Sequence, residues 1–134
     1  MGEEPLPGEA LVLTLDAVPE NISVARRAVA DYARACKADV DRVALAISEA
    51  VTNVVRHAYR GRRAGPVRVK AELDHSDLVV TVADEGRGME PRTDSPGMGM
   101  GLAIIGSVAG GMQLQSSSAG GLAMSIRFPC AGDD

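Results

Sequence analysis

Apolar and polar residues alternate in some stretches of the chain, and in others the apolar residues recur with helical spacing. Alternation puts side chains on the two faces of a strand, whereas recurrence every three or four residues gives an amphipathic helix. The alternating stretches predict strands over residues 10–17, 67–73, 78–83, 112–116 and 122–128, with Leu73 on the apolar face of the second strand. The helical stretches predict a helix opened by Pro19-Glu20-Asn21 and running to about Ala35, with Val24 among its apolar positions. They also predict helices from Asp39 to His57 or Tyr59 and from after Gly101 to about Ala109. In the second helix the apolar stripe expected in the core includes Val43, Ile47, Val51 and Val54.

Turn-forming residues separate these elements. Asp39 suits the N-cap of the second helix, Asp74 to Asp77 reads as a hairpin turn, and the two prolines in 89–96 predict a surface loop. The strands follow one another in pairs, which favours antiparallel neighbours. The expected fold class is therefore α+β, a two-layer α/β sandwich whose mixed, mostly antiparallel sheet is covered on one face by helices.

Length and composition indicate one domain. The chain has 134 residues, and its core must be aliphatic because aromatic residues make up only 2% and Trp is absent. Residues 1–9, rich in proline and glutamate, are expected to form a flexible arm. Residues 10–129 are expected to form the domain, and residues 130–134 a frayed tail.

Charge and cysteine usage narrow the class of protein. Lys and Arg number 14 and Asp and Glu 18, interspersed along the chain, so we expect no nucleic-acid partner. No apolar stretch approaches the roughly 20 residues of a membrane span, so we expect no membrane partner. The N-terminus has no signal-peptide pattern, and Cys36 and Cys130 form no CxxC pair. Free thiols in a reducing, cytoplasmic setting are expected.

The second predicted helix carries the first candidate chemistry. Glu49 and Asn53 lie one turn apart beside the apolar stripe, with small Ala46 next to them. A carboxylate here can accept a proton, and an amide oxygen can bind a hard cation such as Mg²⁺. The alternative is a solvated helix face that happens to contain these two residues.

Residues 84–101 carry the second group of residues with candidate chemistry. Asp84 ends a strand and is followed by glycines at 86 and 88, and a second glycine-rich run precedes the helix at 102–109. The carboxylate can accept a hydrogen bond from an amine, and the N-terminus of a helix offers free N–H groups to phosphate. Asp84 as an ordinary turn residue is the alternative. A lone GxG pattern is weak, and no P-loop sequence is present.

Three motifs together resemble a known family. These are Glu49 and Asn53 on a helix, Asp84-x-Gly86-x-Gly88, and Gly97-x-Gly99-x-Gly101-Leu102, in that order. The combination resembles the GHKL-type ATPase domain of gyrase, Hsp90 chaperones, histidine kinases and MutL-type mismatch-repair ATPases, which has a histidine-kinase-like ATPase fold. Within it, the sequence from Glu49 to Tyr59 is most similar to the bacterial anti-sigma-factor serine/threonine kinases.

The resemblance implies residue roles. Glu49 is the catalytic general base, Asn53 holds Mg²⁺ as the metal ligand, and Asp84 accepts from the adenine amino group. His57 is a further candidate near the phosphates, with a purely structural role as the alternative. The nucleotide-binding set implied is Asn53, His57, Asp84, Gly86, Gly88, Met89, Gly97, Met98, Gly99, Met100, Gly101 and Leu102. Arg56, Arg87 and Arg92 are candidates to pair with the γ-phosphate.

The resemblance also implies a function. The chain is expected to be an ATP- and Mg²⁺-dependent protein serine/threonine kinase that phosphorylates an anti-sigma-factor antagonist, binds a sigma factor and so regulates transcription, with a homodimer as a further association. It departs from the family pattern in its short lid, with Asp94 before the glycines, and in Leu122-Ala123 where relatives have a threonine. The alternatives are a nucleotide-gated protein-binding module with little phosphotransfer, or a detached histidine-kinase-type catalytic domain.

Overall fold

The sheet is built from five strands in the order β1-β2-β3-β5-β4. The computed structural model describes residues 9–86, 110–116 and 121–131 of the chain. The strands are β1 (Leu11–Asp16), β2 (Pro66–Asp74), β3 (Asp77–Asp84), β4 (Gly111–Ser116) and β5 (Leu122–Pro129). Each neighbouring pair is antiparallel, and β2 and β3 form a hairpin in which Asp74 faces Asp77 and Val67 faces Asp84.

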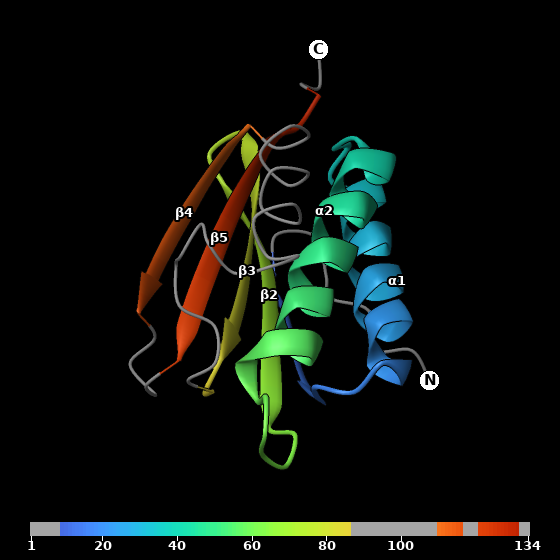
Figure 1. Cartoon of the computed structure of the whole chain (residues 1–134). Coiled ribbons are helices and arrows are strands. Elements are labelled where there is room, and N and C mark those ends of the chain that lie inside the picture. Colours follow the sequence, from blue (N-terminus) through green and yellow to red (C-terminus); the bar gives the residue numbers. More distant parts are fainter. Residues whose placement is uncertain (1–8, 87–109, 117–120, 132–134) are drawn as a thin grey trace.

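In the described part of the chain, two helices cover one face of this sheet (Figure 1). They are α1 (Glu20–Ala35) and α2 (Val40–Asn53), and α2 continues directly as a π-helical segment, η1 (Val54–Ala58). The side chain of Asp39 accepts a hydrogen bond of 3.2 Å from the Arg42 amide, which confirms Asp39 as the N-cap of α2. The structure therefore confirms the expected α+β fold and its helix-covered sheet. The helix predicted over 102–109 lies outside the described residues.

The core lies between the helices and the sheet. Alternate residues of β2, β3 and β5 point into it, as the period of two predicts. They meet the stripes of small and branched residues on α1 and α2. The largest fully buried side chains are Phe128, Ile47, Leu78, Met124, Ile126, Val29, Val43, Val51, Val54 and Val67.

Three expectations about the elements need correction. Val24 is 45% exposed and Leu73 is 42% exposed, although the sequence pattern placed both on apolar faces. Leu73 lies one residue before the end of β2. The second helix is not α-helical up to His57, because η1 begins directly after Asn53.

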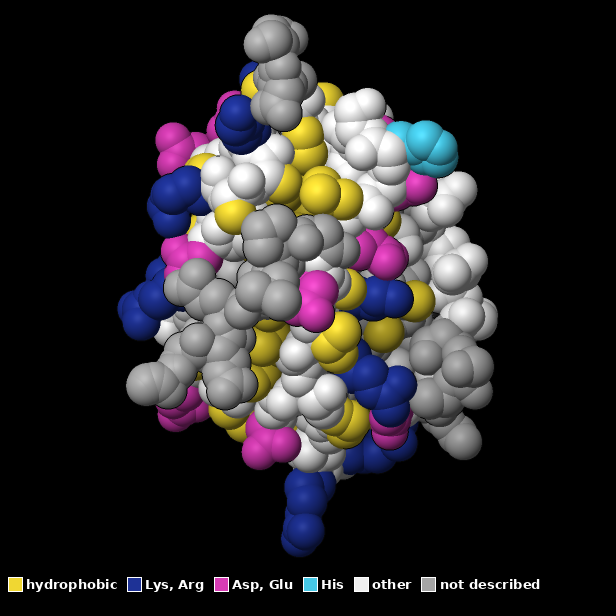
Figure 2. Space-filling view, turned by 180° about the vertical axis from the view of Figure 1, so that it is seen from behind, with side chains coloured by type: hydrophobic (Ala, Val, Ile, Leu, Met, Phe, Trp, Pro, Cys, Tyr) yellow, Lys and Arg dark blue, Asp and Glu magenta, His cyan; other side chains and the backbone are white. Residues whose placement is uncertain are grey.

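Both ends of the described chain are attached to α1 or the turn after it. The Tyr32 hydroxyl donates to the Glu9 carbonyl oxygen at 2.8 Å. Cys130 forms an isolated antiparallel bridge with Ala38, and the Ala131 amide donates to the Lys37 carbonyl oxygen at 2.9 Å. On the face shown in Figure 2, acidic, basic and hydrophobic side chains are interspersed.

Candidate functional site

The helix α2 carries Glu49 and Asn53 toward its C-terminal end. Ala46, one turn before Ala50, is fully buried, and Asn53 is 3% exposed, whereas Glu49 is half-buried. The Asn53 Nδ2 atom has no hydrogen-bond partner among the described residues. A buried amide without a partner costs free energy, which favours a site completed by a ligand over a solvated helix face.

His57 lies in η1, one turn further along. It is buried, and its Nδ1 is hydrogen-bonded to the guanidinium of Arg60. Burial, together with the positive charges of Arg60 and Arg56, lowers the pKa of His57. The imidazole is therefore held in its neutral form and orders Arg60 at the end of the helix.

Asp84 ends strand β3 and is 2% exposed. Its Oδ1 atom accepts hydrogen bonds from the Gly86 amide at 2.9 Å and from the Leu122 amide at 3.4 Å. Its Oδ2 atom has no partner among the described residues. Burial raises the pKa of Asp84, and the two backbone donors only partly oppose this effect. One carboxylate oxygen is thus fixed by the backbone, while the other is available as an acceptor.

Two glycines allow the backbone to pack tightly around Asp84. A Cβ atom on Gly86 would overlap the carbonyl group of Ala58, and one on Gly121 would overlap the Asp84 carbonyl oxygen. Gly86 therefore brings the chain after β3 against the last residue of η1. This contact joins the helix that carries Asn53 to the strand that carries Asp84, and both end at the lower side of Figure 1.

Tyr59 makes a second connection between the same elements. Its hydroxyl donates to the Pro66 carbonyl oxygen at 2.6 Å and accepts from the Glu85 amide at 2.9 Å. The structure thus brings Asn53, His57, Asp84 and Gly86 to one end of the molecule. The other residues of the predicted nucleotide-binding set lie outside the described residues: Gly88, Met89, Gly97, Met98, Gly99, Met100, Gly101 and Leu102.

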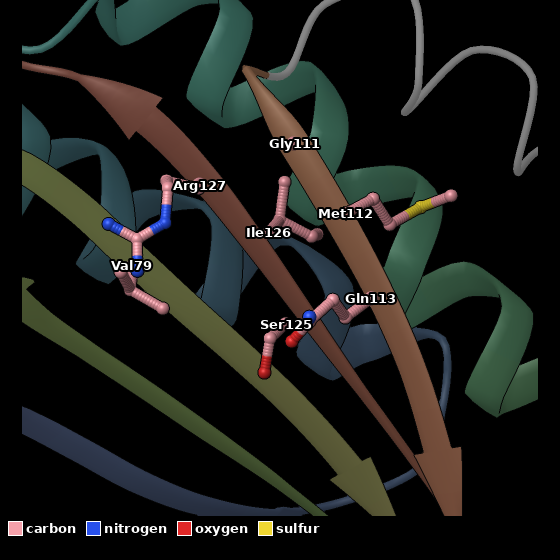
Figure 3. A pocket seen from close by; sticks show the side chains of 7 residues that line it. All are labelled: Val79, Gly111, Met112, Gln113, Ser125, Ile126 and Arg127. Carbon is pink, nitrogen blue, oxygen red and sulfur yellow. The ribbon is translucent and has the colours of Figure 1, made fainter.

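A pocket of about 400 Å³ lies elsewhere, on β3, β4 and β5 (Figure 3). Val79, Ser125 and Arg127 line it together with residues of β4, and none of the predicted site residues does. It is open, and it lies toward the Asp77 end of β3, away from Asp84. We assign it no role in the site.

This fold, with a buried acid at the end of β3 and an Asn-bearing helix beside it, is that of a known ATPase class. Residues 14–128 match the family model of the histidine kinase-like ATPase domain. The chain belongs to this family. The resemblance seen in the motifs is thereby confirmed.

The similar curated proteins include anti-sigma F factors and a serine-protein kinase. The anti-sigma F factor of Clostridium beijerinckii is 31% identical over 122 residues, which cover 81% of this chain and 85% of that protein. The anti-sigma F factor of Clostridium acetobutylicum is 34% identical over 116 residues, covering 76% and 80%. The serine-protein kinase RsbW of Listeria innocua is 31% identical over 88 residues, covering 63% and 56%.

Solved structures share the fold. A crystal structure of the RsbU and RsbW domains of a Mycobacterium tuberculosis protein matches with a TM-score of 0.68 at 23% identity, covering 92% of this chain and 34% of that one. The histidine kinase AdeS of Acinetobacter baumannii matches with a TM-score of 0.55 at 16% identity, covering 91% and 68%.

Within the described residues, no helix has the length and apolar character needed to cross a membrane.

Sequence reasoning alone did not identify Tyr59 and Gly121 as parts of the site. The chain has two Tyr residues, and a partly buried tyrosine hydroxyl usually has a hydrogen-bond partner. That signal could have selected Tyr59. The partners themselves, Pro66 and Glu85, follow only from the strand register.

Proposed function

We propose that this chain binds Mg-ATP and acts as an anti-sigma factor with protein serine/threonine kinase activity on an anti-sigma-factor antagonist. The observation that carries the proposal is the buried Asp84, whose Oδ2 atom lacks a partner among the residues that the structure describes. Membership of the ATPase family, and similarity to proteins named anti-sigma F factor and serine-protein kinase RsbW, support the same function.

Asp84 suits the recognition of adenine. An ionised carboxylate only accepts hydrogen bonds, and the exocyclic amino group of adenine donates them. With Oδ1 fixed by the Gly86 and Leu122 amides, Oδ2 is the atom that would accept from this amino group. Guanine presents a carbonyl oxygen at the corresponding position, so ATP is the expected ligand rather than GTP.

Glu49 and Asn53 suit the phosphate side of the site. The side-chain oxygen of Asn53 would hold Mg²⁺, and Nδ2, which has no partner among the described residues, can donate to a phosphate oxygen. Mg²⁺ would neutralise the charge of the phosphates. Glu49 would take the proton of the substrate serine or threonine hydroxyl. The hydroxyl oxygen of the substrate would bond to the γ-phosphorus as the bond from the γ-phosphorus to ADP breaks and ADP leaves.

A phosphotransfer assay tests this function. Purified chain is incubated with γ-labelled ATP, Mg²⁺ and a candidate anti-sigma-factor antagonist protein, and compared with Glu49→Gln and Glu72→Gln. We expect phosphoserine or phosphothreonine on the antagonist with the wild type and with Glu72→Gln, whose side chain lies on β2 and pairs with Lys70. Loss of the general base should lower the rate by about 100-fold or more.

The other results separate the alternatives. ATP binding without phosphotransfer would replace the kinase by a nucleotide-gated binding module. Transfer of the labelled phosphoryl group to a histidine would indicate a histidine-kinase-type catalytic domain. Absence of ATP binding would overturn the whole proposal.

Partners and location follow from the same proposal. A sigma factor and its antagonist are the protein partners, a homodimer is the expected association, and the cytoplasm is the expected compartment. We propose residues 10–129 as the domain, which includes the whole family match over 14–128. Co-purification with the sigma factor in the presence of ATP, and its loss on adding the antagonist, is the matching binding experiment.

A further inference from the structure

The ladder between β2 and β3 ends at one particular rung. Val67 faces Asp84, so the same register would place Pro66 opposite Glu85. Pro66 has no amide hydrogen, and the next rung can therefore contain only one bond, from the Glu85 amide to the Pro66 carbonyl oxygen. The Tyr59 hydroxyl occupies the place of that bond, accepting from Glu85 at 2.9 Å and donating to Pro66 at 2.6 Å.

The tyrosine is held there by its surroundings. Its ring covers Gly65, where any Cβ atom would meet the ring carbons, and the Gly65 carbonyl oxygen accepts from the Ala17 amide at 2.9 Å. Burial raises the pKa of Tyr59, so the hydroxyl keeps the proton that it donates to Pro66. Arg68 binds the Glu85 side chain at 2.8 Å and limits how far Glu85 can move away from β2.

The inserted hydroxyl affects the position of Asp84. The hydroxyl separates β3 from β2 directly after Asp84. The chain then passes over the Ala58 carbonyl group at position 86, where only a glycine fits. The Gly86 amide, in turn, fixes Asp84 Oδ1 at 2.9 Å. The orientation of Oδ2, which has no partner among the described residues, therefore depends on where Glu85 and Gly86 lie.

We infer that Tyr59 is a positioning residue for base recognition: its hydroxyl, inserted between Pro66 and Glu85, sets the orientation in which Asp84 accepts from the adenine amino group. This inference rests on the proposed function, because it assumes that the ligand is an adenine nucleotide. Without the hydroxyl, the Glu85 amide can close directly onto Pro66, which draws Gly86 away from Ala58 and releases Asp84 Oδ1.

The test measures base discrimination rather than binding alone. Dissociation constants of ATP and of inosine triphosphate, which has a carbonyl oxygen in place of the amino group, are determined by calorimetry for wild type, Tyr59→Phe and Tyr32→Phe. Tyr32→Phe is the control, because it removes a tyrosine hydroxyl that donates to the Glu9 carbonyl oxygen, in α1 rather than beside Asp84. Thermal unfolding checks that each variant is folded.

We expect the preference of the wild type for ATP over inosine triphosphate to fall about ten-fold in Tyr59→Phe and to stay unchanged in Tyr32→Phe. A merely structural role would weaken both nucleotides equally and leave the ratio intact, and that result would overturn the inference. Wild-type protein that binds neither nucleotide would overturn the proposed function, and this inference with it. Wild-type protein that binds both equally would remove the role of Asp84 in base recognition, and hence that of Tyr59.

Discussion

Gly121 lies so close to Asp84 that a Cβ atom at position 121 would overlap both the carbonyl oxygen and Oδ1 of Asp84. The contact comes from the antiparallel register of β3 and β5, in which Ala83 faces Ala123. The residue after Ala83 is Asp84, and it therefore lies beside the residues that precede Ala123. The close approach to Asp84 is thus possible because the residue directly before β5 has no side chain.

Gly121→Ala should therefore damage both the fold and the site. The added methyl group must push against backbone atoms and a carboxylate, which typically costs about 1–3 kcal/mol. We expect a melting temperature several degrees lower and an ATP affinity at least about ten-fold weaker, measured by scanning fluorimetry and calorimetry. Gly111→Ala is the control, because its Cβ would meet only the Arg127 side chain at 3.9 Å. Equal behaviour of the two variants would contradict the close packing described here.

Asp84→Asn should raise stability while removing function. Burial raises the pKa of Asp84 above the ordinary value of 3.8, so the folded protein binds this proton more tightly than the unfolded chain does. Stability is therefore lost as the pH rises through the folded pKa, and the ionised carboxylate is unfavourable at neutral pH. The amide keeps an oxygen that accepts from Gly86 and Leu122, without the charge.

We expect nucleotide-free Asp84→Asn to melt a few degrees higher than wild type at pH 7.5, with the difference shrinking toward pH 4. Added ATP should raise the melting temperature of the wild type but not of the variant. Asp77→Asn, at the other end of β3, loses an exposed ion pair to Arg127 and serves as the control. A variant less stable than wild type at pH 7.5 would show that Asp84 stabilises the fold itself.

His57 should make the protein sensitive to mild acid. Burial and the charges of Arg60 and Arg56 lower the pKa of His57 below its ordinary value of 6.5, so the unfolded chain binds this proton more tightly. Stability contributed by the neutral imidazole is complete above the unfolded pKa and is lost as the pH falls toward the folded pKa. His57→Gln should show a smaller drop in melting temperature between pH 7.5 and 5 than wild type. His75→Gln, altered at an exposed turn position, should keep the wild-type drop.

Cys36 should react slowly with alkylating agents. Burial, and next the neighbouring Cys130 thiol, raise the pKa of Cys36 to about 11. Only the thiolate reacts, and the burial of Cys36, the largest cause of the raised pKa, remains when Cys130 is replaced. In Cys130→Ser the rate with iodoacetamide should therefore be low at pH 8 and rise steeply with pH above it. The same variant in urea provides the unfolded reference. A folded rate equal to the unfolded rate would show that Cys36 is not shielded.

Much of the fold was predictable because the helix and strand periods are strong in this chain. The core positions Val43, Ile47, Val51 and Val54 were read correctly from helical spacing, and Asp39 was recognised as a cap. Val24 was not, because spacing gives the direction of a side chain but not whether a partner element covers it.

The candidate site was predictable only in part. Glu49, Asn53 and Asp84 could be proposed from the sequence because their chemistry is visible in the residue type. The roles of Gly121 and Tyr59 depend on which backbone atoms the sheet register brings opposite them, and that information is spread over residues far apart in the chain. The remaining site assignments stay predictions.

The π-helical segment η1 has a consequence for motif spacing. A π turn closes on the fifth residue rather than the fourth, so it holds one residue more than an α turn. It is geometrically equivalent to a single insertion in an ordinary helix, absorbed between Asn53 and Tyr59. One residue removed from this segment would restore the ordinary helix and leave both side chains in place. We therefore expect the spacing between Asn53 and Tyr59 to tolerate the loss of one residue better than the four-residue step from Glu49 to Asn53 within α2 does.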